Sequence, residues 1–175
     1  MPKQIDHDAH RRDIAQRAAP LFSEMGYSGL GMRRIAEELG LSKSALYHYF
    51  PTKKSLFLAC TEAIMKDVQT EEVPEQTDDG AADAVIAFAR KHEPGFAREM
   101  ALLFDYLRGK TAREIAADPA MRLANGRLRQ QVEKVSGAAD PDAVMCLVMG
   151  TLLMRHFTGG ELPYETLRPL LDNLR

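Results

Sequence analysis

The sequence predicts an all-α fold of about nine helices, with a small three-helix head followed by a larger helical body. Apolar residues recur at helical spacing from end to end, whereas the strict alternation that is typical of β-strands is nearly absent. A hydrophobic fraction of 45% and a charged fraction of 27% are ordinary for a folded globular chain of 175 residues. We therefore expect helices along most of the length.

A first helix is predicted to end at Gly26, because glycine adopts the left-handed conformation that closes a helix without steric cost. Arg11, Arg12 and Arg17 lie largely outside the apolar face of this helix. That face consists of Ile14, Ala18, Leu21, Phe22 and Met25.

The segment 32–50, MRRIAEELGLSKSALYHYF, has the features of two short helices joined by a tight turn. Gly40 lies between them, where a turn needs the positive φ that glycine reaches without strain. Ala36 is small where the two helices must approach closely, and Ser42 is placed to cap the second helix. The apolar anchors are Ile35, Leu39, Leu41, Leu46 and Tyr49.

The second of these helices, over about residues 43–49, has an outer face whose side chains all donate hydrogen bonds. This pattern is typical of the recognition helix of a helix-turn-helix, which lies in the major groove of DNA. The alternative is a helical hairpin whose polar face only meets water, but such a hairpin does not demand the small residue and the glycine. The outer face consists of Lys43, Ser44, Tyr47 and His48.

A fourth helix is predicted from about Thr52 to Gln69, and the acidic stretch from Thr70 to Gly80 is a linker or a frayed helix end. Two antiparallel helices are predicted next, over 85–92 and 96–107. They are separated by Pro94-Gly95, which we expect to break the helical periodicity.

Three further helices complete the body. Asp118-Pro119 starts one of them, and Asp140-Pro141 provides an N-cap with proline at the first helical position of the next. Gly159-Gly160 ends that helix. A last helix has a stripe formed by Leu167, Leu170, Leu171 and Leu174.

The run from Gly26 to Ala59, GYSGLGMRRIAEELGLSKSALYHYFPTKKSLFLA, resembles the TetR family of bacterial transcriptional regulators. The family pattern is IA..(A/L)G(V/L)S...LY.(H/Y)F..K..L. Outside this run the chain resembles the family only in the number and order of its helices. The pattern is met by Ile35, Ala36, Leu39, Gly40, Leu41, Ser42, Leu46, Tyr47, Tyr49, Phe50, Lys53 and Leu56.

The resemblance implies that Tyr47 and Lys53 bind backbone phosphates and that Lys43, Ser44 and His48 lie near base edges. Lys53 comes near the start of the fourth helix, where backbone N–H groups also bind phosphate. The alternatives are a solvated lysine, a tyrosine that packs on its neighbours and a histidine that only covers the surface.

One position departs from the family. Members usually have Ser or Thr just before the residue that matches Met32, where the hydroxyl caps a helix and touches phosphate, but this chain has Gly31. Glycine caps passably yet offers no side-chain contact. Arg33, one turn further on, is expected to compensate or to reach a base, and Arg34 is a weaker candidate for a phosphate. The expected DNA-binding residues are Arg33, Arg34, Ser42, Lys43, Ser44, Tyr47, His48 and Lys53.

A single recognition helix makes too few base contacts for specificity, and two-fold pairing is the usual remedy. We therefore expect a homodimer on double-stranded operator DNA, with a DNA-binding domain in residues 1–51 and a dimerisation and effector-binding domain in residues 52–175. The helix over 141–156, apolar almost all round between Ala143 and Met154, and the final leucine stripe are the interface candidates. A plain buried helix is the alternative.

The resemblance also implies a cavity in the body for a small-molecule effector whose binding releases a repressor from its operator. We expect an apolar or amphipathic ligand, since methionine adapts to varied shapes. The alternative is that the Met and Phe residues of the body only pack a core, and the protein would then be a dimeric DNA-binding regulator without an effector. The presence of an enclosed cavity discriminates between these two kinds of regulator. The residues expected to line this cavity are Phe88, Met100, Phe104, Met121, Met145 and Met149.

An enzyme is the main competing class, but the sequence has no HExxH, ExxH or P-loop motif. No catalytic residue, cofactor or metal site is therefore expected. His7 and His10, beside Asp6 and Asp8, fit a mobile polar tail better than a metal site.

Charge and cysteine content agree with a regulator. The net charge is −2, yet residues 1–54 carry nine Lys/Arg against six Asp/Glu, so the basic surplus lies with the motif. Cys60 and Cys146 lie far apart in apolar surroundings and are predicted to be buried, unpaired thiols. Since no signal peptide and no apolar run long enough for a bilayer is present, we expect a cytoplasmic protein with no membrane contact.

Overall fold

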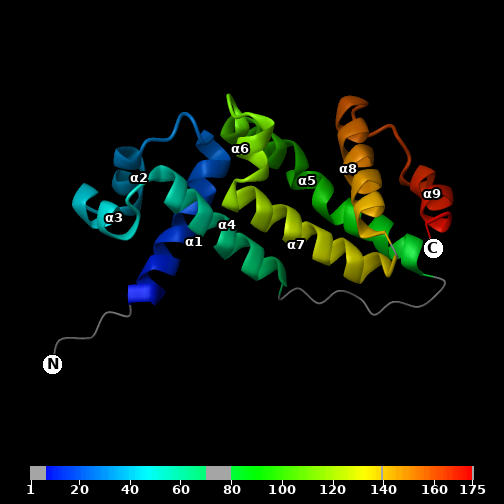
Figure 1. Cartoon of the computed structure of the whole chain (residues 1–175). Helices are drawn as coiled ribbons and strands as arrows, with labels where there is room; N and C mark the ends of the chain where they lie inside the picture. The colour runs from blue at the N-terminus through cyan, green and yellow to red at the C-terminus, as the bar shows by residue number, and fades with distance from the viewer. Residues whose placement is uncertain (1–6, 70–79, 139, 175) are drawn as a thin grey trace. The chain divides into compact units, whose positions relative to one another are not determined.

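The computed structural model describes residues 7–69, 80–138 and 140–174, and all regular structure within them is helical (Figure 1). The predicted all-α class is confirmed. The expected linker from Thr70 lies outside the described residues up to position 79. In chain order the elements are α1 (His7–Met25), α2 (Met32–Leu39), α3 (Lys43–Tyr49), α4 (Lys53–Gln69), α5 (Ala81–Leu107), α6 (Ala112–Ala116), α7 (Pro119–Ser136), α8 (Pro141–Phe157), the 3₁₀ turn η1 (Tyr164–Leu167) and α9 (Arg168–Asp172).

The chain divides into two compact units. Unit 1 comprises Met1–Thr70 and Glu99–Ala124, and unit 2 comprises Glu71–Arg98 and Asn125–Arg175. Helices α5 and α7 each contribute residues to both units. The functional division expected between residues 51 and 52 stays a proposal.

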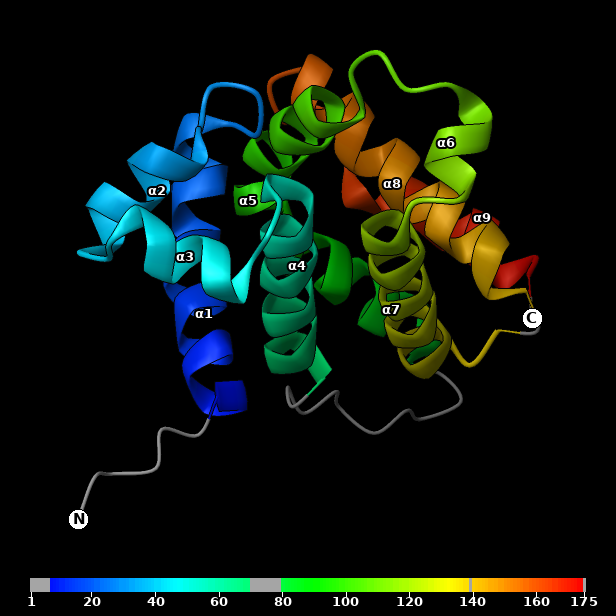
Figure 2. The same ribbon diagram turned by 60° about the vertical axis from the view of Figure 1, so that its left-hand side comes forward.

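Unit 1 has one apolar core, in which α1 packs against α4 and against α2, and α2 packs against α3 (Figure 2). Leu46 from α3 and Phe50 just after it are fully buried, so the recognition helix is anchored by its inner face. Four aromatic rings extend the core, with neighbouring centroids 4.3–5.9 Å apart. These rings belong to Phe22, Tyr27, Phe57 and Tyr106.

Unit 2 has a core of β-branched residues and leucines beside a polar cluster. Arg155 Nε donates to Glu93 Oε1 at 2.7 Å, and the Tyr164 hydroxyl donates to Glu93 Oε2 at 2.7 Å. These bonds join α5, α8 and η1. The buried apolar residues include Val85, Val132, Val144, Val148, Leu152, Leu167 and Leu171.

The predicted helix ends are confirmed. Gly26 follows the end of α1 with φ +75°, Gly40 ends α2 with φ +68°, and Gly159 and Gly160 after α8 also have positive φ. Asp140 caps α8 as expected, because its side chain accepts hydrogen bonds from the backbone N–H groups of residues 142 and 143. The positions of the helix-ending glycines and of the Asp140 cap were therefore predictable from the sequence.

The predicted break at Pro94-Gly95 is wrong, because α5 runs without interruption from residue 81 to 107. A proline removes one backbone bond and crowds the preceding turn, but Pro94 is exposed and the helix is held by buried residues before and after it, such as Ala89 and Phe96. The short helix α6 was not predicted. Nine α-helices in the described part of the chain agree with the expected number because these two differences offset each other.

Two further expectations are corrected. His7 and His10 lie in α1 rather than in a mobile tail, because their rings contact the α3 residue Tyr49 at centroid distances of 5.3 and 5.1 Å; Asp6 lies outside the described residues. Cys60 is buried as predicted, but Cys146 is exposed because it lies on the face of α8 opposite the buried valines.

No single helix in the described ranges is both long and apolar enough to span a membrane; α7 and α8 pass that test only when taken together as a bent pair.

Candidate nucleic-acid interface

The turn between α2 and α3 sets the geometry of the candidate interface. Gly40 N–H bonds the carbonyl of Glu37 at 3.1 Å, and Leu41 N–H bonds the carbonyl of Ala36 at 2.8 Å. This pair of bonds is a Schellman motif, which requires the left-handed residue that only glycine provides without strain. Arg17 of α1 donates to the carbonyl of Leu39 at 2.7 Å and satisfies another carbonyl at the same helix end.

Helix α3 presents the predicted polar face to solvent. Ser42 Oγ accepts from the N–H of Ala45 at 3.1 Å and caps the helix, and it also lies 3.1 Å from Ser44 Oγ. Tyr47 is 40% exposed, and the ammonium of Lys43 lies 5.7 Å from its ring centroid. All four predicted contact residues of this helix are exposed: Lys43, Ser44, Tyr47 and His48.

His48 has neighbours that the sequence did not predict. Its ring centroid lies 5.2 Å from that of Tyr49 and 5.5 Å from that of His7 in the first turn of α1. His10 also contacts Tyr49. The first turn of α1 therefore borders the recognition helix, and no local pattern in the sequence links these two segments.

The two arginines of α2 are paired with glutamates one turn along the same helix. Arg33 Nε lies 3.0 Å from Glu37 Oε1, and Arg34 Nη2 lies 2.5 Å from Glu38 Oε1. The Arg33 side chain is 83% exposed. Exposed pairs of this kind contribute little stability, so a phosphate can replace the glutamate as the partner of either arginine.

The N-cap of α2 is Gly31, the residue that departs from the family pattern. This residue has φ −91° and ψ 154°, and it makes no side-chain capping bond. A Cβ atom built there meets nothing within 4 Å. The position therefore has both the space and the backbone conformation for the hydroxyl residue that the family usually carries.

Lys53 begins α4 and already has a partner. Its ammonium donates to the carbonyl oxygen of Tyr27 at 2.8 Å and lies 4.4 Å from the centroid of the Tyr27 ring. The helix start is fixed by reciprocal bonds, since Thr52 Oγ1 accepts from Ser55 N at 3.0 Å and Ser55 Oγ accepts from Thr52 N at 3.2 Å. An ammonium has three donors, so Lys53 keeps two for a phosphate.

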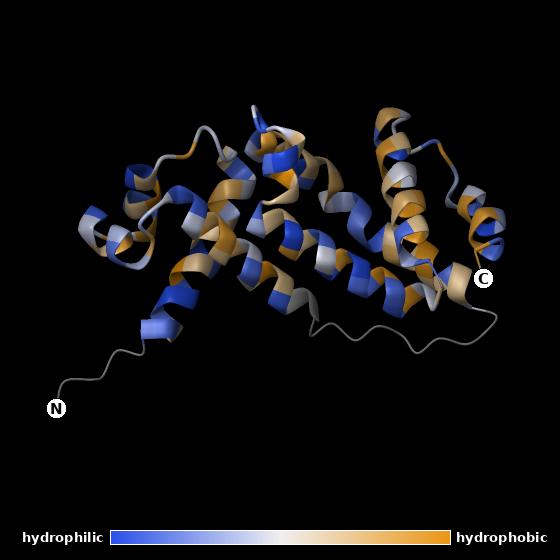
Figure 3. Cartoon of the chain, viewed as in Figure 1, coloured by the Kyte–Doolittle hydropathy of each residue, from blue (hydrophilic) through white to orange (hydrophobic). Residues whose placement is uncertain are grey.

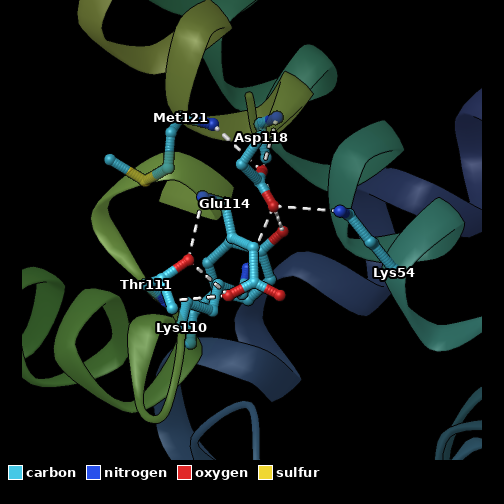
Figure 4. Close-up of polar contacts among 8 residues, drawn as sticks. Lys54, Lys110, Thr111, Glu114, Asp118 and Met121 are labelled. Atoms are coloured by element: carbon cyan, nitrogen blue, oxygen red, sulfur yellow. Dashed lines mark hydrogen bonds and ion pairs between the residues drawn. The ribbon is translucent and has the colours of Figure 1, made fainter. Parts of the chain in front are cut away.

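A buried carboxylate beside α4 is not predicted by any sequence pattern. The sequence predicts Asp118 only as the start of a helix, yet its carboxylate binds a tyrosine and the two lysines labelled in Figure 4. Its burial acts to raise the pKa of this carboxyl, but hydrogen bonds from Lys110, Tyr106 and Lys54 outweigh that effect and hold the pKa well below its usual range. No signal along the sequence joins Asp118 to Lys54, which lies 64 residues earlier in the chain.

The six residues expected to line an effector cavity do not form one site in either unit. Met100, Phe104 and Met121 belong to unit 1, whereas Phe88, Met145 and Met149 belong to unit 2. Phe104 is 65% exposed, and Met121 is part of the unit 1 core.

Unit 1 has an open hollow elsewhere, between α1 and α4, with a volume of about 360 Å³. Its lining includes Arg11, Arg12 and Lys66. Across the residues that the structure describes, no three His, Cys, Asp or Glu side chains converge to hold a metal ion.

A helix-turn-helix with an exposed, hydrogen-bonding recognition helix and a lysine at the following helix start defines a DNA-binding transcriptional regulator. Comparison with known proteins supports this class. Residues 12–60 match the family described as "Bacterial regulatory proteins, tetR family".

Relatives extend the similarity to the whole chain. An HTH-type transcriptional repressor of Mycobacterium tuberculosis, Rv1474c, is 30% identical over 98% of this chain and 95% of its own length. The regulator PksA of Bacillus subtilis is 41% identical over 68 residues, 39% of this chain, and the matched part spans a third (33%) of its length. The solved structure titled "Flavonoid-responsive Regulator FrrA" has a TM-score of 0.56 and 26% identity, and it covers 94% of this chain and 92% of its own.

The chain belongs to the TetR family. Since this family consists of transcriptional regulators, the expectation of a regulator in place of an enzyme is confirmed.

Proposed function

We propose that the protein is a homodimeric, cytoplasmic repressor that binds a double-stranded operator and leaves it when a small molecule binds. The observation that carries the proposal is the exposed polar face of α3, next to Lys53 at the start of α4. In this reading Lys43, Ser44 and His48 contact base edges, and Tyr47 and Lys53 contact phosphates. Arg33, Arg34 and Ser42 contribute at the margin of the interface.

Repression and ligand response rest on the relatives. Rv1474c is named a transcriptional repressor, and FrrA is titled a flavonoid-responsive regulator. We infer an apolar or amphipathic effector for this chain from those names and from the Met and Phe content of its helices. A dimeric regulator without an effector is the second candidate, because Met121 is part of the unit 1 core and the six residues expected to line a cavity form no single site within either unit.

Dimer formation is supported by α8, most of which is hydrophobic (Figure 3). Apolar residues on the outer face of this helix remain exposed within unit 2. Cys146, Gly150, Met154 and Phe157 follow one another at intervals of three or four residues and lie on one stripe of this helix. Phe157 is 71% exposed. A stripe of this kind is typical of an interface that a second copy covers.

The final leucine stripe contributes less than the sequence suggested. Leu167 and Leu171 are buried within unit 2, whereas Leu170 is exposed. Leu170 is therefore the member of that stripe that we assign to the dimer interface. Substitution of Leu171 would disturb the core and would not test dimerisation.

The test of DNA binding is selection of duplexes from a random-sequence pool by the full chain. Enrichment of a palindromic sequence with half-sites about one helical turn apart, about 34–36 Å, supports a dimer with two recognition helices. Enrichment of no sequence contradicts operator binding. A screen of apolar and amphipathic compounds, including flavonoids, for release of the enriched duplex then separates the effector-dependent regulator from the dimer-only regulator.

A further inference from the structure

The carboxylate of Asp118 is almost fully enclosed, at 1% exposure, and it accepts more hydrogen bonds than a helix cap needs. Its oxygens accept from the Tyr106 hydroxyl at 2.8 and 2.9 Å, from Lys110 Nζ at 2.9 Å and from Ala120 N at 3.0 Å. Lys54 Nζ lies 3.1 Å away and forms an ion pair (Figure 4). All of these groups belong to unit 1.

A charge in this position is not explained by stability alone. Removing a carboxylate from water is costly, and apolar residues of similar volume often stabilise a core as well as a buried ion pair does. Capping of α7 does not require the charge either, because asparagine caps a helix equally well. The charge of Asp118 holds each of the two lysines at a fixed distance through an ion pair. One of these lysines, Lys54, belongs to α4.

Lys54 is the neighbour of Lys53 in the first turn of α4, and the two side chains are tied to different elements. Lys53 bonds the Tyr27 carbonyl in the segment between α1 and α2, whereas Lys54 pairs with Asp118 at the start of α7. Successive residues on a helix point about 100° apart. The first turn of α4 is therefore held from two directions.

Tyr106 connects the two ties. Its hydroxyl donates to Asp118, and its ring meets that of Tyr27 edge-on with centroids 4.7 Å apart. Burial and the charge of Asp118 also raise the pKa of Tyr27. Tyr27, whose carbonyl orients Lys53, is thus supported by Tyr106, which bonds Asp118.

We propose that Asp118 is a positioning residue for the DNA interface: through Lys54 it fixes the first turn of α4, and through Tyr106 it supports the Tyr27 carbonyl that orients Lys53. This inference rests on the proposed contact between Lys53 and a DNA phosphate. Operator affinity then depends on a carboxylate that is enclosed in protein and touches no DNA.

The test uses three substitutions in the full chain. Asp118→Asn removes the charge and keeps an acceptor for the α7 cap. Lys54→Met removes the ion pair to α4. Lys110→Met is the matched control for the α4 tie. It removes the other ion pair of the same carboxylate and the contact of the ammonium with the Tyr106 ring, 3.4 Å from the centroid, but it leaves the Lys54 pair and the Tyr106–Asp118 hydrogen bond in place. Thermal unfolding first identifies a temperature at which every variant is folded.

Affinity is then measured for the duplex that the wild-type chain enriches. Asp118→Asn and Lys54→Met are each expected to weaken binding about tenfold, and the double variant is expected to bind no more weakly than Asp118→Asn alone. Lys110→Met should stay within about twofold of wild type. Additive losses would show that Lys54 touches DNA directly, and equal losses in all three variants would show a purely structural role; either result overturns the proposal.

A second measurement does not depend on DNA, so failure of operator binding and failure of this inference are distinguishable. Hydrogen exchange of the backbone amides of residues 53–58 should accelerate in Asp118→Asn and in Lys54→Met but not in Lys110→Met. Unchanged exchange in this segment for the first two variants would also overturn the proposal.

Discussion

Replacement of Lys53 by alanine tests the proposed phosphate contact most directly. Each phosphate that a cation neutralises contributes about 0.9 to the slope of log affinity against log salt, and a dimer contains two copies of Lys53. Lys53→Ala is therefore expected to reduce the magnitude of that slope by about 1.8. Between 50 and 200 mM salt the affinity of the variant should fall about 12-fold less than that of the wild type.

The structure indicates which side effect must be controlled. Lys53 also satisfies the Tyr27 carbonyl, so alanine removes an internal hydrogen bond as well as a charge. Lys53→Gln keeps an N–H donor and removes only the charge, and it should give the same slope change with a smaller loss of stability. Lys66→Gln is the matched control, because Lys66 lies on the same helix about 20 Å further along and should leave the slope unchanged.

The assay is a fluorescence anisotropy titration of the enriched duplex, and of an unrelated duplex of equal length, at four salt concentrations. Both duplexes should lose affinity alike, since a phosphate contact carries no sequence information. A slope equal to that of the wild type would refute the phosphate assignment. A loss confined to the enriched duplex would place Lys53 against a base.

Four further outcomes are expected. Gly31→Ser should raise the free energy of unfolding by a few tenths of a kcal/mol and tighten DNA binding without changing the salt slope, because a hydroxyl caps α2 and contacts phosphate without adding charge; weaker DNA binding in anisotropy titrations would contradict this. Asp118→Asn should lower the free energy of unfolding in urea by about 2 kcal/mol near pH 7. That difference should shrink as the pH falls below about 4, because the folded-state pKa of Asp118 is lowered and its contribution is lost only on protonation; a pH-independent difference would count against the ion pairs. Phe157→Glu should produce monomers in sedimentation at unchanged helix content, since Phe157 is exposed, whereas an intact dimer would place the interface off the outer face of α8. Cys146, but not Cys60, should react with a bismaleimide to give a covalent dimer on denaturing gels, because Cys146 is exposed whereas burial raises the pKa of the Cys60 thiol to about 12; Cys146→Ser should abolish the product, and a product that persists would exclude this assignment.

The parts of the fold that local chemistry decides were predicted from the sequence. Glycines with positive φ, the Ser42 and Asp140 caps and the apolar faces of the helices depend on residues only a few positions apart. The continuation of α5 through Pro94 was not predictable in this way, since burial on both sides of the proline outweighs its local penalty. Tertiary packing decides whether such a helix continues, and tertiary packing cannot be predicted from about ten neighbouring residues.

The same distinction applies to the candidate interface. The outer face of α3 was predicted residue by residue, because the helix-turn-helix pattern is local. The bond from Lys53 to Tyr27 spans 26 residues and the pair of Lys54 with Asp118 spans 64, so neither has a signature in the spacing of the sequence. Side chains that position the interface were therefore harder to predict than those that form it.

The bond between Lys53 and the Tyr27 carbonyl has a consequence for the thermodynamics of association. A lysine that is mobile in solution loses up to about 2 kcal/mol of rotamer entropy when a ligand immobilises it. Lys53 is already held at its ammonium before any DNA arrives, so most of that entropy is lost during folding and not during binding. In each subunit of the proposed dimer this preorganisation favours fast capture of a phosphate. It also makes the contact less dependent on temperature than one formed by an unrestrained lysine.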